Sequence, residues 1–387
     1  MHQIYALFIL FFAMVTLQVN CYLNIVPKMV PQTRYFKNVY GLNSYPTIKS
    51  HQRESFSIKG TITSTINYVK KTKWPSIINL WEFTRPHTIL GSAISLLSLY
   101  LYAVPQNLWF TSKFRESILS AAIPSLLMNI YITGLNQVTD IEIDKINKPY
   151  LPIAAGNLTK NKATSIIISC IIGSIYLARS AAWPLLGTIL GSAILGTIYS
   201  LPPFRIKRYP LLAALFILVV RGSLVNLGFF YQAKIDVLNE NIPNIVTAIS
   251  KFPEGIYLTT FFAIFGVVIA IMKDTPDVAG DEKFNIPSFS VKLGAKRMFG
   301  FSWKLLYFLL TSTSLGFIFK FLQCHSISSS TVKLYRILCA TSFTLLANDV
   351  KIRAEKVDYN ESKSIFEYYM HIWNIFYFCY FLLPFVR

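Results

Sequence analysis

Two short acidic motifs stand out in a chain that is otherwise rich in apolar residues. The first runs from Asn136 to Asp144 and the second from Lys273 to Asp281. Each follows an apolar stretch, and its acidic residues recur every three or four positions, so that on a helix each set shares one face. Carboxylates beside hydrocarbon are costly unless they are paired, hydrated or bound to metal. The pattern therefore predicts a site that binds a cation.

Mg²⁺ is the expected cation, because it prefers oxygen ligands and is commonly held by one or two carboxylates together with substrate phosphates. Two facing motifs could hold two such ions on a diphosphate. The candidate ligands are Asn136, Asp140, Asp144, Asp277 and Asp281. The alternative is that these acids cap helices or pair with neighbouring lysines, namely Lys145, Lys148, Lys273 and Lys283. Two copies of the pattern on one membrane face favour the metal.

Basic residues that suit phosphate binding follow another apolar stretch. Arg205 could grip phosphate oxygens bidentately and Lys207 could act as a point charge. Arg85, just before the first apolar stretch, has the same potential. For all three the alternative is a positively charged anchor at the membrane surface.

Three further polar residues fall at or within apolar stretches. Arg221 should face the interior and find a partner, either a substrate carboxylate or phenolate or an internal acid. His87 and His371 are expected to be hydrogen-bonded structural histidines rather than catalytic bases.

The elements that must position these residues are membrane helices. The chain of 387 residues is 53% hydrophobic and only 14% charged, with a mean hydropathy of +0.46, which indicates an all-α, polytopic membrane protein. About nine apolar stretches have the length of a transmembrane helix. They lie near residues 86–104, 117–135, 163–179, 183–199, 210–230, 256–272, 299–320, 331–348 and 366–385.

The charge distribution predicts the topology of these helices. The formal net charge of +19 comes from Lys and Arg in loops rather than from a continuous basic face, so we expect no nucleic-acid partner. Basic residues concentrate after the even-numbered stretches, which places those loops in the cytoplasm or stroma. Both acidic motifs then open on the same side of the bilayer. The five cysteines show no metal-ligand spacing.

Residues 1–73 differ in composition from the rest of the chain. They contain nine Lys or Arg and a single acid, Glu54, which is typical of an organelle transit peptide. We expect this targeting region to be disordered or removed, with a plastid destination. The apolar run from Ile4 to Val19 makes the secretory pathway the lesser alternative. The segment from Trp74 to Thr84 is predicted to lie on the membrane surface.

Together the motifs resemble those of the UbiA superfamily of intramembrane prenyltransferases. The first has the pattern Asn-Gln-x-x-Asp-x-x-x-Asp-Lys-x-Asn-Lys-Pro and the second Lys-Asp-x-x-Asp-x-x-Gly-Asp, and the resemblance covers about residues 74–387. It is strongest to the plant branch that acts on homogentisate, flavonoids and coumarins. The resemblance implies nine helices around a central cavity. Ala279 departs from the Glu that is frequent in plant relatives.

The resemblance also implies roles for individual residues. Asp274 joins the metal set given above, and the four catalytic candidates are Asp140, Asp144, Asp277 and Asp281. Diphosphate contacts are expected from Asn136, Arg205, Lys207, Lys273 and Arg85.

The motifs and the resemblance lead to three candidate functions. The first is Mg²⁺-dependent transfer of a prenyl group from an allylic diphosphate to a ring carbon of a phenolic acceptor such as a flavonoid or coumarin. The alternative is homogentisate phytyltransfer in tocopherol synthesis. A cation-coupled transporter is a remote third. A transporter predicts acids at the middle of the membrane and interrupted helices, whereas the acids here lie at the ends of the apolar stretches.

Overall fold

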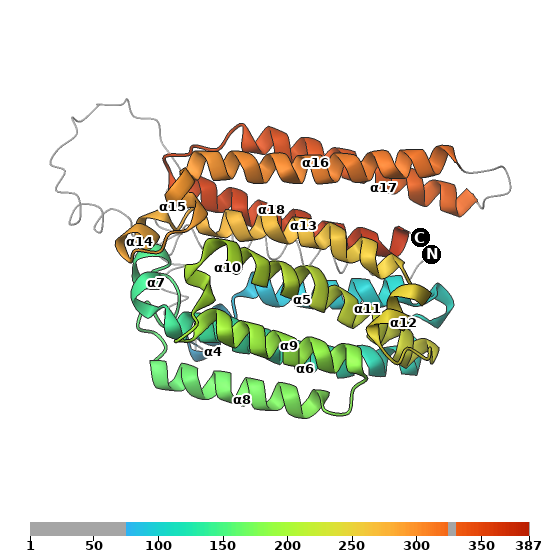
Figure 1. Ribbon diagram of the computed structural model, residues 1–387, viewed down its shortest axis with the longest axis horizontal. Coiled ribbons are helices and arrows are strands. Elements are labelled where there is room, and N and C mark those ends of the chain that lie inside the picture. The colour runs from blue at the N-terminus through green and yellow to red at the C-terminus, as the bar shows by residue number, and fades with distance from the viewer. Residues whose placement is uncertain (1–74, 324–329, 387) are drawn as a thin grey trace, which may run out of the picture. The chain divides into compact units, whose positions relative to one another are not determined.

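The computed structural model describes residues 75–323 and 330–386, and every regular element in these ranges is helical (Figure 1). The predicted all-α class is therefore confirmed. The targeting region expected at residues 1–73 lies outside the described residues. The chain divides into two units, Met1–Leu80 and Trp81–Arg387, and the arrangement described below is that of the second unit.

Long helices dominate the second unit. They are α5 (Pro86–Ala103), α6 (Ser112–Thr139), α8 (Lys160–Ala178), α9 (Trp183–Ser200), α10 (Pro210–Ile217) continued by η3 (Leu218–Leu224) and α11 (Val225–Leu238), α13 (Glu254–Asp274), α16 (Ala295–Leu322), α17 (Ser330–Ala354) and α18 (Ser362–Leu382). The shorter elements are α4 (Pro75–Phe83), η1 (Gln106–Leu108), α7 (Ile141–Asn147), η2 (Ile206–Arg208), α12 (Ile245–Lys251), α14 (Val278–Lys283), α15 (Phe289–Leu293) and η4 (Leu383–Phe385).

Six of the long helices in the described ranges are long and apolar enough to cross a membrane: α6, α8, α9, α10 to α11, α13 and α16. The other three expected stretches are also helical, as α5, α17 and α18, but they are less apolar. The number nine is therefore not confirmed. α4 covers most of the segment predicted to lie on the membrane surface.

Local sequence signals set several helix boundaries. The hydroxyl groups of Thr111 and Thr159 accept hydrogen bonds from the backbone of the first turn of α6 and α8. Proline stands in the first turn of α5, α9 and α10, where its missing N–H costs nothing. The N-terminal boundaries of these helices thus follow ordinary capping chemistry.

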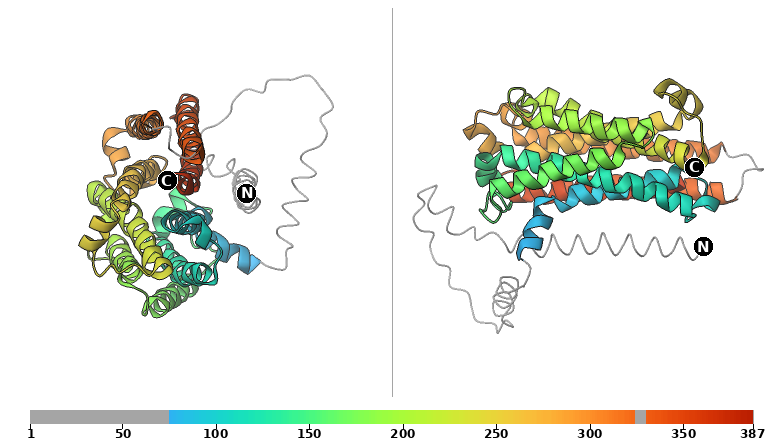
Figure 2. Two further views of the ribbon diagram at one scale, coloured as in Figure 1. Left: turned by 90° about the vertical axis from the view of Figure 1, so that its right-hand side faces the viewer. Right: turned by 90° about the horizontal axis from the view of Figure 1, so that it is seen from below.

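The long helices lie side by side (Figure 2), with α16 packed along α17 and α6 along α8. The C-terminal helix α18 contacts both α5 and α13, although α5 is far away in sequence. Its buried aromatic residues carry this packing, and the ring of Tyr380 stacks on Phe262 of α13 at 3.8 Å. α18 therefore closes the bundle on the side of α5.

The short helices α7 and α14 pack on one another at one end of the bundle, and α12 lies at the opposite end (Figure 1). α7 carries part of the first acidic motif and α14 part of the second. A Cβ atom at Gly280 of α14 would come within 2.1 Å of Oδ1 of Asn147. The glycine of the second motif therefore permits the close approach of the two motif helices.

We expect Gly280→Ala to separate α7 from α14, because overpacking of this kind costs about 1–3 kcal/mol. The measurement is hydrogen exchange of the purified protein, in which the amides of both short helices should exchange faster. Asn147→Ala should restore protection when it is combined with Gly280→Ala, because it removes the atoms that the new methyl group meets. Equal exchange in wild type and Gly280→Ala would contradict this account of the glycine.

Candidate active site

The two acidic motifs meet at the end of the bundle that α7 and α14 occupy. Lys148, which follows α7, forms an ion pair with Asp277 of the second motif. Asp144, Asp277 and Asp281 are only 5%, 7% and 8% exposed. The prediction that both motifs open on the same side is therefore confirmed.

A second set of ion pairs attaches the loop after α9 to the first motif. Nη2 of Arg205 lies 2.8 Å from Oδ1 of Asp140, and Nζ of Lys207 lies 2.6 Å from Oδ2 of the same carboxylate. Arg205 also donates to the carbonyl of Thr139 at 3.2 Å. One aspartate thus anchors both basic side chains, and its role as a metal ligand stays a prediction.

The charges in this cluster influence one another strongly. Burial raises the pKa of Asp140, but Lys207 and Arg205 outweigh it and hold that pKa below its ordinary value. Burial also lowers the pKa of Lys207 to about 8, even though Asp140 acts in the opposite direction. The carboxylate of Asp140 is therefore ionised at neutral pH.

Two arginines of the site adopt the left-handed backbone conformation. φ is +53° at Arg85 and +39° at Arg205, which costs about 1–2 kcal/mol for a residue with a side chain. Arg85 lies within electrostatic range of Asp144, Asp277 and Tyr369, and its buried Nε atom has no hydrogen-bond partner. Such strain clusters at functional sites because the surrounding structure must impose it.

Lys273 and Asp274 end α13 beside the same cluster. Nζ of Lys273 donates to the hydroxyl of Tyr199 at 3.2 Å, and it lies 3.9 Å from Oδ1 of Asp274. Asn136 lies one turn before Asp140 on α6 and is partly accessible. All the site residues predicted from the sequence therefore gather at one end of the bundle.

The carboxylates fit a divalent cation that brings its own anionic ligands. Oδ2 of Asp144 is buried without a hydrogen-bond partner, and burial raises the pKa of this carboxyl despite Lys148 and Arg85. Burial, with Asp274 and Asp277 nearby, also raises the pKa of Asp281 to about 7. Within the described residues no three acidic, His or Cys side chains form a metal-binding group by themselves. Mg²⁺ held by one or two carboxylates and by phosphate oxygens suits this arrangement.

Sequence reasoning gave no functional role to three residues that the structure puts in this site. Lys148 was considered only as a surface partner for an acid, yet it joins the two motifs. Nε2 of Gln137 donates to the carbonyl of Phe83 at 2.7 Å and so fixes the turn that carries Arg85. Tyr369 of α18 lies within electrostatic range of Arg85, Lys148 and Lys273. Gln137 and Lys148 lie inside the quoted motif, whereas nothing in the sequence distinguishes Tyr369.

The other polar residues of the apolar stretches have different surroundings. Nε2 of His371 pairs with Asp349 of α17 at 2.6 Å, which supports the structural role predicted for it. The ring of His87 packs edge-on against Trp373 at 5.3 Å. The guanidinium of Arg221 lies over the same Trp373 ring, 5.3 Å from its centre.

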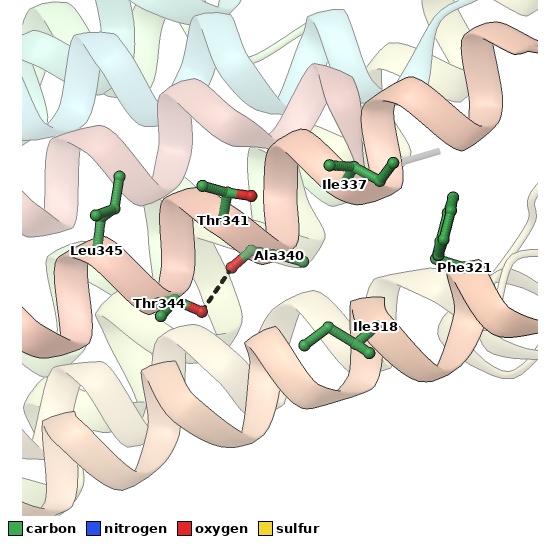
Figure 3. A pocket seen from close by; sticks show the side chains of 7 residues that line it. All are labelled: Ile318, Phe321, Ile337, Ala340, Thr341, Thr344 and Leu345. Atoms are coloured by element: carbon green, nitrogen blue, oxygen red, sulfur yellow. Dashed lines mark hydrogen bonds between the residues drawn. The ribbon is translucent and has the colours of Figure 1, made fainter.

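Hollows lie among the described helices, and two of them differ in their lining. A cavity of about 100 Å³ lies between α5, α6, α9, η3 and α11, and Arg221 is in its wall. A second hollow of about 280 Å³ lies between α16 and α17 (Figure 3). Its lining is mainly aliphatic and aromatic and carries no charge. Only the first hollow offers groups that could orient a polar substrate.

Known proteins match this chain over most of its length. The model of the UbiA prenyltransferase family matches residues 87–375. Homogentisate phytyltransferase 1, chloroplastic, of Arabidopsis thaliana is 36% identical over 89% of this chain and 84% of its own. Homogentisate geranylgeranyltransferase of Triticum aestivum is 37% identical over 79% and 72%. Glycinol 4-dimethylallyltransferase of Glycine max is 30% identical over 79% and 71%.

The fold also has a solved counterpart. A UbiA homolog from Archaeoglobus fulgidus bound to DMAPP and Mg²⁺ superimposes with a TM-score of 0.52 and 16% identity, over 79% of this chain and 99% of that one. This likeness supports the polytopic membrane fold. The family match and the curated relatives carry the assignment of activity, because they cover most of the chain at 30% identity or more. The chain therefore belongs to the UbiA prenyltransferase family and is a membrane-bound aromatic prenyltransferase.

Proposed function

We propose that this protein transfers a long prenyl group, with phytyl as the first choice, from its allylic diphosphate to a ring carbon of homogentisate. The observation that carries the reaction is the convergence of both acidic motifs and the basic side chains at one end of the bundle. The acceptor is supported by the homogentisate prenyltransferases among the relatives. They favour the alternative given by the sequence over its first expectation, a flavonoid or coumarin.

The basic side chains are the groups that would receive the departing diphosphate. Arg205 and Lys207 are held in place by Asp140, and Arg85 and Lys273 lie in the same cluster. When the allylic C–O bond breaks, its electron pair stays on the diphosphate, and preorganised cations stabilise that charge as it develops. Arg205 and Arg85 can each offer two parallel hydrogen bonds to phosphate oxygens.

The residues that fit the metal are Asp144, Asp277 and Asp281, with Asp274 near Asp281. Asn136, one turn before Asp140 on α6, is a further candidate. Bound Mg²⁺ would neutralise charge on the diphosphate and orient it. Asp144 offers a buried oxygen without a partner, and Lys148 keeps the charge of Asp277 compensated. This set of carboxylates would therefore hold the metal that binds the donor diphosphate.

The aromatic residues of α18 suit the second half of the reaction. Tyr369 lies beside the cationic cluster, and its ring packs against that of Trp373 at 6.4 Å. The faces of such rings stabilise positive charge on an allylic group. The ring carbon of the acceptor supplies the electron pair of the new C–C bond, and loss of the ring proton restores aromaticity. Buried walls keep water from capturing the allylic group.

The chloroplastic phytyltransferase among the relatives supports a plastid membrane as the location. With that destination, residues 1–73 would be the targeting region and residues 74–387 the prenyltransferase domain. The glycinol dimethylallyltransferase supports a second candidate, a short donor and a more complex phenolic acceptor, at lower identity.

The first test offers dimethylallyl, geranylgeranyl and phytyl diphosphates to membranes that contain the protein, each against homogentisate, a set of flavonoids and simple coumarins. We expect ring-prenylated product from homogentisate with phytyl diphosphate. Mass spectrometry identifies this product, whether it has kept or lost the carboxyl group of homogentisate. A flavonoid or coumarin product with the short donor would favour the second candidate. No product from any pair would overturn both.

Asp144→Asn and Asp277→Asn should each lower kcat about 100-fold or more, because each removes charge that orients the donor in its transition state. Activity should also disappear with EDTA and return with Mg²⁺. Glu142→Gln is the matched control, because Glu142 is an exposed acid of the same segment that forms an ion pair with Lys145. Wild-type kinetics in both asparagine variants would contradict the metal assignment.

Arg205→Ala and Lys207→Ala should raise the KM for the prenyl diphosphate about tenfold or more, because each removes a charged hydrogen-bond donor. The KM for the acceptor should change little. Arg208→Ala serves as control, since Arg208 is an exposed cation of the same short element η2. An unchanged donor KM in the first two variants would make these residues membrane anchors.

A further inference from the structure

Arg221 is a cation inside a membrane-spanning helix, and no acid neutralises it in the part of the chain that the structure describes. None of the ion pairs formed by the described residues includes it. Its neighbours are the Trp373 ring, 5.3 Å from its guanidinium carbon, and the tyrosines Tyr369, Tyr377 and Tyr380. A charge at this depth normally pairs with an acid or faces a polar cavity. Of the two outcomes considered from the sequence, an internal acid is therefore not the one observed.

The backbone is built to hold Arg221 where it is. The residue lies in η3, a π-helical segment of seven residues between α10 and α11, and such segments are frequent at functional sites. Asn226 donates to the carbonyls of Arg221 and Gly222 at 2.8 Å each, and it accepts a hydrogen bond from Tyr380 at 2.7 Å. These bonds satisfy the backbone groups that the widened turn releases.

The close packing of η3 against α13 fixes its position further. A Cβ atom at Gly222 would come within 2.6 Å of Cα of Ala263. Because that neighbour is backbone, no side-chain rotation could relieve the contact. The position of η3, and with it that of Arg221, is thus fixed by the hydrogen bonds of Asn226 and by the packing of Gly222 against α13.

The cavity of about 100 Å³ beside Arg221 is lined by several polar side chains. Ser92 and Asn129 are hydrogen-bonded to each other at 2.8 Å. The buried hydroxyl of Ser125, in the same wall, has no hydrogen-bond partner. A buried cation and a free hydroxyl in one small cavity fit an anionic group that accepts hydrogen bonds.

The cavity lies on the same face of α6 as the first acidic motif. Ser125, Asn129 and Thr133 line the cavity at four-residue spacing, and Asn136 and Asp140 continue the row toward the end of the helix. Eleven residues separate Ser125 from Asn136, so the cavity extends roughly 16 Å below the motif at 1.5 Å per residue. Tyr369 and Trp373 join the two places from the side of α18.

We propose that Arg221 binds the carboxylate of the aromatic acceptor, an inference that rests on the proposed function. The diphosphate has its own basic residues at the end of the bundle, and the cavity is too small for a long prenyl chain. A carboxylate can accept two parallel hydrogen bonds from the guanidinium. An arylacetate bound this way extends its ring from Arg221 toward Trp373 and Tyr369, where the prenyl group is released.

This arrangement makes Arg221 a determinant of acceptor class. A flavonoid or coumarin without a carboxylate would leave the buried cation unpaired, which costs binding energy. Homogentisate supplies the missing charge and places its ring at a fixed distance from the diphosphate. The same residue therefore binds the favoured acceptor and discriminates against neutral ones.

The test compares two acceptors in wild type, Arg221→Met and Arg221→Lys. Homogentisate carries the carboxylate, and its methyl ester has the same ring and arm without the charge. We expect Arg221→Met to raise the KM for homogentisate about 10- to 150-fold, the range for loss of a charged hydrogen bond. The KM for the ester should stay the same or fall, because the variant has no buried cation to leave unpaired, and the KM for the prenyl diphosphate should stay within about threefold. Arg221→Lys, which keeps the charge, should recover part of the loss.

A binding measurement that needs no turnover accompanies the kinetics. Homogentisate should raise the thermal unfolding temperature of the wild-type protein in detergent and should not raise that of Arg221→Met. Arg179→Met is the matched control, because Arg179 also lies over an aromatic ring, that of Tyr176 at 3.8 Å, but is exposed. This control should bind homogentisate as the wild type does.

The outcomes separate the two proposals. Suppose that wild type prenylates homogentisate and that Arg221→Met loses activity toward homogentisate and toward its methyl ester equally. Arg221 is then a structural cation over Trp373, and only this inference is overturned. Equal kinetics in wild type and Arg221→Met overturn it as well. If wild type does not prenylate homogentisate in the presence of Mg²⁺ and any of the donors, the proposed function fails and the inference fails with it.

Discussion

The mutual compensation of buried charges at one end of the helix bundle is the constraint on which this structure depends. Asp140 binds Arg205 and Lys207, and Asp277 binds Lys148. These pairs connect the end of α6, the loop after α9, and the short helices α7 and α14. Each partner would be costly to bury alone. The network therefore fixes four segments relative to one another and holds Arg205 and Lys207 in place for an anionic ligand.

Close contacts between helices bring the charged and aromatic residues of the site together. The close contact of α7 with α14 depends on Gly280, and the turn that carries Arg85 depends on the hydrogen bond from Gln137. The buried aromatic face of α18 packs on α5 and α13 and so brings Tyr369 and Trp373 beside the polar end. Prenyl transfer asks for such a combination, because a departing diphosphate needs cations while an allylic cation needs a dry, electron-rich wall.

The polar row on α6 gives the site depth. It begins at the first acidic motif and reaches a cavity where Arg221 has no acidic partner among the described residues. Basic side chains in two places, at the end of the bundle and at Arg221 within it, match a reaction between two anionic substrates. The aromatic residues of α18 lie between these regions, where neither substrate's charge would be placed.

The sequence by itself determined the fold class, the membrane character and the residue types of the site. Apolar length and helical spacing are local properties, so the stretches and the shared faces of Asp140 and Asp144 could be predicted, and charge in loops predicted that both motifs open on one side. The pairing of Lys148 with Asp277 and the recruitment of Tyr369 depend on contacts between distant segments. Nothing in residue spacing encodes such contacts. Only the tertiary structure decided whether Arg221 meets an acid or a cavity, because that outcome depends on how η3, α6 and α18 pack together.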